Sequence, residues 1–277
     1  MCADNDHHGR PAVTEPTPVD LAKLKRRDVV LGLASGTLLL AGCETNPVTG
    51  RSQFTAFAPS DAQLATLALD SWTKQKHDTP ISRDPAYNAR LQRVGQRIAA
   101  VSGLQNVQWE FVVFDTPEKN AFVLPGGKVG FYKGIMDLAT KDDHIACVMG
   151  HEVGHVQARH AAERYSQQTG TELLMGAAQV GLSNTQNANA WMAAIGLGAQ
   201  VGILLPYSRL QESEADRVGV DNMHNAGYDV REAVHFWELM AAQGGSRAPA
   251  LLSTHPSPAG RMADLRAYIN QRGYAQM

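Results

Sequence analysis

The chain has few cysteines, little net charge and no long hydrophobic run. These shortages argue, in turn, against internal disulfides, a nucleic-acid partner and a membrane-spanning helix. With 3 cysteines in 277 residues, of which only Cys147 lies in the folded part, no internal disulfide is expected there. A net charge of −2 gives no reason to expect nucleic acid as a partner. The apolar run Val29–Leu40 covers about a dozen residues, whereas a membrane-spanning helix needs about 20. A globular protein fits the 44% hydrophobic and 19% charged residues.

The N-terminus has the pattern of an export signal. About twenty polar residues without periodicity, which predict disorder, precede the basic stretch 25–27 and the apolar run 29–40. The run ends in Leu-Ala-Gly-Cys43, which resembles the lipobox of bacterial lipoproteins, where the cysteine thiol takes the lipid. We therefore predict a disordered leader plus lipoprotein signal peptide over 1–42 and a lipidated tether over 43–58, with a short buried helix as the alternative.

Two details bear on export and sorting. Arg26-Arg27 also fits twin-arginine export, although a basic flank alone explains the pair. Glu44 follows Cys43, and Gram-negative lipoproteins with Asp at that position tend to stay on the inner membrane. The resemblance therefore implies a periplasmic protein anchored to the outer membrane through Cys43.

Residues 59–277 show no internal repeat and no second change of composition, so they predict one α+β domain. Hydrophobic spacing and cap residues predict helices, and alternating Val-, Phe- and Trp-rich segments predict strands. The predicted helices cover 60–76, 89–103, 141–165 and 208–221, and the predicted strands lie in 107–115 and on both sides of Pro125-Gly126-Gly127.

Residues 171–205 contain two apolar runs rich in small residues. Each is shorter than the roughly 20 residues that a bilayer requires, and Gln179 or Gln200 interrupts it. Two packed core helices are the preferred interpretation. A flap over an active site, or contact with the bilayer, is the alternative.

The segment HEVGHVQARH carries the strongest chemical signal. On a helix, His151 and His155 lie one turn apart on the same face, so both can direct a ring nitrogen at one ion. Glu152 is rotated by about a third of a turn and can reach water at that ion without being a ligand. This spacing indicates a zinc site, but a catalytic zinc needs a third protein ligand from elsewhere.

The third ligand is predicted in SRLQESEADRVGVD. Glu212 and Asp216 share a helix face, and gluzincin-type sites take a glutamate from such a second helix. Asp216 can accept the outer N–H of a ligating histidine and hold its ring. The alternative for Glu212 and Glu214 is a solvated acidic face.

Together these segments resemble peptidase family M48, the zinc peptidases that include HtpX, the prenyl-protein proteases and the lipoprotein proteases BepA and LoiP. The resemblance runs from NPVTGR through NAFVLPGG, HEVGHVQARH and ESEAD to THPSPAGR. It implies a predominantly helical gluzincin-type domain with a small sheet beside the active-site helix. It also implies that Glu212, not Glu214, is the ligand, that His255 lies near the zinc, and that Arg261 belongs to the same element.

Other residues of the motifs receive no catalytic role. His144 stands two turns before His151, where relatives often carry an acidic residue, and we expect a partly exposed histidine rather than a supporting role at the metal. Arg159, His160 and Arg209 also match family positions and are interpreted as structural.

The expected mechanism is peptide hydrolysis at one Zn²⁺ per chain, with Glu152 as the group that takes and returns a proton. His255 or Tyr207 would stabilise the oxyanion, or His255 would fill the open coordination position of a resting enzyme. An extended, unfolded substrate would add as a strand along an edge near Gly127–Phe131.

The family resemblance implies quality control of cell-envelope proteins, outer-membrane proteins among them, by a zinc-dependent endopeptidase. Two alternatives are a chaperone-like outer-membrane assembly factor with secondary or latched proteolysis, and a structural zinc protein with His255 as a permanent fourth ligand.

Overall fold

The computed structural model describes residues 42–182, 207–243, 249–255 and 260–274. The chain divides into two compact units. One comprises Met1–Ala58 with Ala162–Ile203, and the other comprises Pro59–Ala161 with Leu204–Met277. All the site residues predicted above, apart from Cys43, belong to the second unit.

The first unit contains a hairpin where the sequence predicted an irregular tether. Strands β1 (Cys43–Thr45) and β2 (Ser52–Phe54) pair antiparallel, and the Asn46 side chain accepts hydrogen bonds from the backbone of the turn. Helix α7 (His160–Leu182) continues into this unit, where Arg51 binds the carboxylate of Glu163 through two hydrogen bonds of 2.7 and 2.6 Å.

Little of the segment 171–205 can be compared with its prediction. Residues 183–205 lie outside the described part, so the proposed core helices or flap are not tested there. Residues 171–182 are helical as the end of α7. Within the described residues, every helix is too short or too polar to cross a membrane.

The second unit contains a three-stranded sheet of order β3-β5-β4. β3 (Glu110–Phe114) runs parallel to β5 (Lys128–Tyr132), and β4 (Ala121–Leu124) runs antiparallel to it. The two strands around Pro125-Gly126-Gly127 are confirmed, and Gly126 and Gly127 have φ of +85° and +80°, which favour glycine.

The prediction that substrate adds along an edge near Gly127–Phe131 is wrong. These residues lie at and in β5, which is paired on both sides and has no free edge. The outer edge of β3 is also engaged, since Ser82 donates its N–H to Val113 and Ile81 bridges Phe114. In this three-stranded sheet, the outer edge of β4 is paired with no described strand.

The two N-terminal helices of this unit are present, with α3 (Asp61–Asp78) starting after Ser60 as predicted and α4 (Pro85–Val101) starting four residues before its predicted start at Ala89. Ser60 caps α3 with a capping box completed by Gln63, and α4 is capped by Asp84. Gly103 follows α4 with φ +68°, in the left-handed conformation that ends helices.

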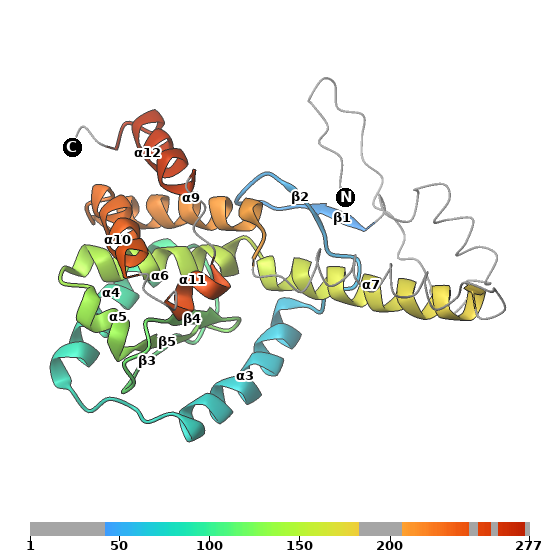
Figure 1. Cartoon of the computed structure of the whole chain (residues 1–277), viewed down its shortest axis with the longest axis horizontal. Helices are drawn as coiled ribbons and strands as arrows, with labels where there is room; N and C mark the ends of the chain where they lie inside the picture. Colours follow the sequence, from blue (N-terminus) through green and yellow to red (C-terminus); the bar gives the residue numbers. More distant parts are fainter. Residues whose placement is uncertain (1–41, 183–206, 244–248, 256–259, 275–277) are drawn as a thin grey trace. The chain divides into compact units, whose positions relative to one another are not determined.

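The long helix predicted over 141–165 is broken. α6 (Asp142–Gln157) ends at Ala158, Arg159 adopts φ +52°, and α7 begins at His160. The remaining helices are α5 (Lys133–Leu138), which the sequence did not predict, α9 (Arg209–Asn225), α10 (Arg231–Ala242), α11 (Ala250–Thr254) and α12 (Arg261–Gln271). In Figure 1, α6 lies between α9 and the sheet.

Glycines allow α6 and α9 to pack backbone against backbone. A Cβ added at Gly150 would lie 2.8 Å from the Gly219 carbonyl oxygen, and one at Gly154 would lie 2.9 Å from that of Ala215. A Cβ at Gly219 would in turn lie 2.8 Å from the His151 nitrogen. The ligand-bearing turns of the two helices therefore touch without intervening side chains.

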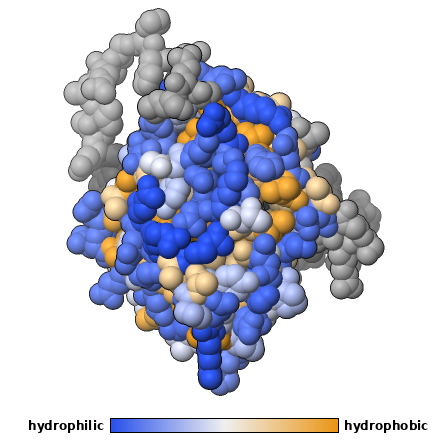
Figure 2. All heavy atoms as spheres, turned by 90° about the vertical axis from the view of Figure 1, so that its left-hand side faces the viewer, coloured by the Kyte–Doolittle hydropathy of each residue, from blue (hydrophilic) through white to orange (hydrophobic). Residues whose placement is uncertain are grey.

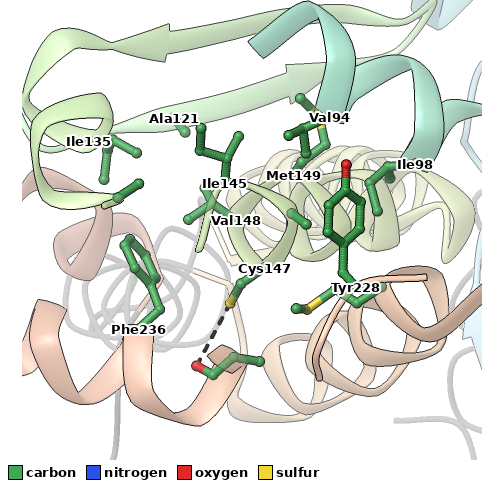
Figure 3. Close-up of a cluster of buried hydrophobic side chains, with 14 of the residues drawn as sticks. Val94, Ile98, Ala121, Ile135, Ile145, Cys147, Val148, Met149, Tyr228 and Phe236 are labelled. Carbon is green, nitrogen blue, oxygen red and sulfur yellow. Dashed lines mark hydrogen bonds between the residues drawn. The ribbon is translucent and has the colours of Figure 1, made fainter. Parts of the chain in front are cut away.

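Apolar side chains of α4, α6, α10 and the sheet form the main core. Figure 3 shows Ile145, Val148, Met149 and Phe236 around Cys147, whose thiol donates to the Ala233 carbonyl oxygen at 3.8 Å. Cys147 is a buried, free thiol, as predicted. The face drawn in Figure 2 is mainly hydrophilic, with hydrophobic residues in small groups.

The close approach of α6 and α9 predicts that Gly150→Ala destabilises the protein. The methyl group would overlap backbone that cannot move independently, at a cost of about 1–3 kcal/mol. Denaturant unfolding measures this cost. Gly260→Ala is the control, because no atom lies within 4 Å of its Cβ; equal stability of the two variants would contradict tight packing.

Candidate metal centre

Three helices place the side chains of the centre. α6 contributes His151, Glu152 and His155, and α9 contributes Glu212 one turn from its start. His255 follows the last turn of α11. All five side chains are buried, so this is an internal polar cluster rather than a solvated acidic face.

The donor atoms of this cluster converge with spacings suited to one ion. His151 Nε2 lies 3.1 Å from His155 Nε2, and these two atoms lie 3.5 and 3.4 Å from the carboxylate oxygens of Glu212. Atoms bound about 2.0–2.2 Å from a tetrahedral ion are about 3.3–3.6 Å apart. The structure therefore brings the three sequence-predicted residues together, although Glu212 is 57 and 61 positions from His155 and His151 in the sequence.

Asp216 and Arg261 orient His151 from behind. His151 donates its Nδ1–H to Asp216 Oδ1 at 2.9 Å, which leaves the Nε2 lone pair directed at the centre. Arg261 donates to both oxygens of Asp216, and its guanidinium lies over the Trp237 ring, 4.4 Å from the centroid. Asp216 therefore lies at the outer nitrogen of His151, where the sequence predicted it.

His155 is oriented by two residues that sequence analysis did not assign. His160 Nε2 lies 3.0 Å from Glu214 Oε2, which can only accept, so His160 donates there. Its Nδ1 then accepts from His155 Nδ1, 2.8 Å away. His155, like His151, therefore presents an Nε2 lone pair to the centre.

The break after α6 explains why this chain of contacts was missed. In a continuous helix, residues five apart face different directions, and Glu214 lies on a different face from Glu212. The positive φ of Arg159 turns His160 back towards His155 instead. Glu214 is 8% exposed, so the alternative of a solvated acidic face does not hold for it. Sequence periodicity carries no signal for the contact of either residue with His155.

The cluster is incomplete without a cation. Two imidazole lone pairs face each other across 3.1 Å, an arrangement that repels unless a positive charge lies between them. Glu212 Oε2 and Glu152 Oε1 are buried and make no hydrogen bond among the described residues; their nearest cationic neighbours are Arg261 Nη1, 3.0 Å from Glu212 Oε2, and His255 Nε2, 3.4 Å from Glu152 Oε1. The residues present therefore fit a divalent metal ion.

Burial and charge hold the ligands in their binding forms. Burial lowers the pKa of His155 well below its ordinary value, so the ring stays neutral. Burial opposes ionisation of Glu212, but His151, His155 and His255 outweigh it and hold the pKa of its carboxyl far below the usual range. Both residues are thus ready to bind a cation at neutral pH.

Glu152 has a different environment from Glu212. Burial raises the pKa of its carboxyl, against the opposing charges of His255 and His151. The backbone N–H of Val123, in edge strand β4, donates to this carboxyl. Glu152 is therefore fixed between the metal ligands and the open edge of the sheet.

His255 lies inside the ligand group. Its Nδ1 is 2.9 Å from Glu212 Oε1 and 3.2 Å from His151 Nε2, and its Nε2 is 3.4 Å from Glu152 Oε1. The Tyr207 ring stacks on His255, with centroids 5.2 Å apart. His255 thus stands where a fourth ligand would stand.

His144 contradicts its prediction as a partly exposed residue. It is 1% exposed, and its Nε2 lies 2.9 Å from Glu232 Oε2 on α10, away from the metal centre. Burial lowers the pKa of His144 despite that carboxylate. The packing of α10 against α6, which the sequence did not predict, buries it.

The site combines two histidines and a glutamate from two helices. A second glutamate lies beside them, and a sheet edge is within hydrogen-bonding reach. These features define a metallopeptidase centre of the HExxH type. The chain belongs to peptidase family M48, whose family profile matches residues 85–269. It is accordingly a metalloendopeptidase that uses a divalent metal ion.

Its relatives come from mitochondria and bacteria. The chain is 31% identical to the mitochondrial metalloendopeptidase OMA1 of Schizosaccharomyces pombe, over 92% of this chain and 74% of that protein. It is 31% identical to OMA1 of Bos taurus, over 87% of this chain and 50% of the relative. The beta-barrel assembly-enhancing protease of Escherichia coli is 27% identical, over 73% and 43%. The chain thus spans about half the length of the latter two.

The orienting role of Glu214 predicts weaker metal binding in Glu214→Gln. The amide cannot fix the His160 tautomer that His155 needs, and loss of such a partner typically lowers metal affinity by about 10–100-fold. Competition with a zinc-binding dye measures the change. Glu172→Gln, on exposed α7 surface, is the control; identical affinities would show that His155 needs no such partner.

Proposed function

We propose that the chain is a zinc-dependent endopeptidase in which His151, His155 and Glu212 hold one zinc ion. The observation that carries this proposal is the pair of Nε2 lone pairs 3.1 Å apart with Glu212 beside them. Two imidazoles and one carboxylate are a common ligand set of catalytic zinc. When bound, zinc supplies the Lewis acidity that polarises a carbonyl and lowers the pKa of water.

Glu152 is the proton-transfer group of this proposal. A carboxyl with a raised pKa can take a proton from water and return it to the leaving amine. The Val123 N–H and the surrounding packing hold the carboxyl in one place, so it meets water and substrate in a fixed geometry.

Substrate is proposed to add to β4 rather than to the β5 edge predicted from sequence. The free edge of β4 offers main-chain hydrogen bonds that do not depend on side chains. Because Val123 on β4 contacts Glu152, an added strand would pass beside the proton-transfer group. Only an extended polypeptide can bind this way, which favours unfolded or misassembled proteins.

His255 is proposed to act as a latch. Its Nδ1 lies among the ligand atoms, and its Nε2 faces Glu152, so the ring occupies the space that water and a scissile carbonyl need. Contact with both Glu152 and Glu212 raises the pKa of His255 despite its burial, which normally lowers it. The ring must leave before an oxyanion can form there, and Tyr207, stacked beside it, is the alternative donor.

The natural setting is proposed to be the bacterial envelope. The segment from Lys25 to Cys43 supports export and lipidation, and the name of the E. coli relative connects that protein with β-barrel assembly. We infer quality control of outer-membrane proteins by an enzyme anchored through Cys43. Intact mass of the protein isolated from membranes measures whether Cys43 is acylated.

Glu152→Gln is expected to bind zinc but to lose at least about 99% of casein cleavage, because the amide cannot accept a proton; general acid–base groups contribute about 10²–10⁴-fold. Wild-type zinc content is the internal control. Cleavage at the wild-type rate would exclude Glu152 from the reaction.

The same variant separates the second candidate function. If Glu152→Gln restores membrane integrity to cells that lack the protein, the chaperone-like assembly role suggested by the E. coli relative's name is favoured over proteolysis.

The latch predicts that His255→Ala cleaves casein faster than wild type, by several-fold, with a full equivalent of zinc retained. Removing the ring opens the position beside Glu152 while the three ligands remain. Initial rates at equal zinc content measure this. An inactive, zinc-loaded variant would instead assign His255 to oxyanion stabilisation, and loss of zinc would make it a permanent ligand.

A further inference from the structure

A second cluster of metal-ligating side chains lies on α6 and α10. His144 on α6 and Glu232 and His235 on α10 place one donor atom each within 4.8 Å of one another. His144 Nε2 lies 2.9 Å and His235 Nδ1 lies 3.2 Å from the same oxygen, Glu232 Oε2. None of these residues belongs to the centre around His151.

We propose that His144, Glu232 and His235 form a second metal site, for a divalent first-row transition ion such as Zn²⁺, which clamps α6 to α10.

The donor set selects the class of ion. Two imidazoles and one carboxylate suit zinc and its neighbours, whereas Mg²⁺ and Ca²⁺ prefer oxygen ligands alone. The two distances from the imidazoles to Glu232, 2.9 and 3.2 Å, are close to those in the first centre, where ligand atoms are 3.1–3.5 Å apart, and the two imidazole nitrogens lie within 4.8 Å of each other. Small shifts of these side chains would bring the three atoms to the separation of about 3.3 Å expected around a tetrahedral ion.

The surroundings leave the donor atoms available. Lys141 donates to Glu232 Oε1 at 2.7 Å, so the ammonium occupies the oxygen that does not face the imidazoles. Without an ion, His144 carries its ring proton on Nε2, which donates to Glu232 Oε2; an ion bound at Nε2 would require the proton on Nδ1, which is buried without a hydrogen-bond partner among the described residues. The His235 side chain is 52% exposed, which gives an ion access from solvent and leaves room for a water ligand.

The clamp would act on the helix that carries the first centre. Three contacts join α6 to α10 in succession: His144 with Glu232, Cys147 with Ala233 (Figure 3), and the His151 ring with Trp237, 5.3 Å apart. An ion bound at the first of these contacts would hold α6 and α10 together about two turns before His151 on α6. The second site is thus a brace for the catalytic helix.

The test is a zinc titration of the metal-free full-length protein against a chromophoric chelator. We expect two equivalents in wild type, one in His235→Ala and one in Glu232→Gln. His77→Ala, which removes an 86%-exposed histidine of α3, is the matched control and should keep two. Mg²⁺ should not compete for the second equivalent.

His155→Ala separates this proposal from the proposed function. It should lose the first equivalent and keep the second, and zinc should then raise its melting temperature, an increase that is absent when His235→Ala is added. If wild type binds one equivalent of zinc, the variants show which site holds it. Loss of that equivalent in His155→Ala and its retention in His235→Ala would overturn the second site alone. Its loss in His235→Ala and retention in His155→Ala would uphold the second site and overturn the first.

Discussion

Direct backbone contact between α6 and α9 is the constraint on which the rest of the molecule depends. Gly150 and Gly154 on one helix and Gly219 on the other remove the side chains that normally separate helices. At this distance, His151 and His155 meet Glu212 at metal-ligand spacing. The usual interaxial separation of 8–10 Å, which side chains determine, would carry the short Glu212 side chain out of reach. Small residues beside the ligands are therefore part of the metal centre.

A buried polar centre is stable only if each group has a partner, and the second layer supplies these partners unequally. Asp216 and Arg261 satisfy the outer nitrogen of His151, whereas His160 and Glu214 satisfy that of His155. The inner nitrogens of His151 and His155 face each other across 3.1 Å, and the His255 ring lies 3.2 Å from the first of them. This arrangement destabilises the folded protein when no cation is bound. A divalent cation removes the repulsion, so metal binding is coupled to stability.

α10 connects this centre to a more distant part of the core. Trp237 lies against both His151 and the guanidinium of Arg261, and one turn or more earlier α10 meets Cys147 and His144. These contacts follow one another along two packed helices, from Glu232 to the wall of the metal centre. The same helix pair therefore holds His151 at one end and the cluster of His144, Glu232 and His235 at the other.

The sequence by itself determined the local chemistry. The i, i+4 spacings of His151 with His155 and of Glu212 with Asp216 follow from the helical repeat, and the strands around Pro125-Gly126-Gly127 follow from turn chemistry. Tertiary structure decided which strand keeps a free edge, that His160 and Glu214 support His155, that His255 stands among the ligands, and that His144 is buried. These features arise where separate segments meet or where a helix breaks at one residue, and periodicity, which describes single elements, contains no information about either.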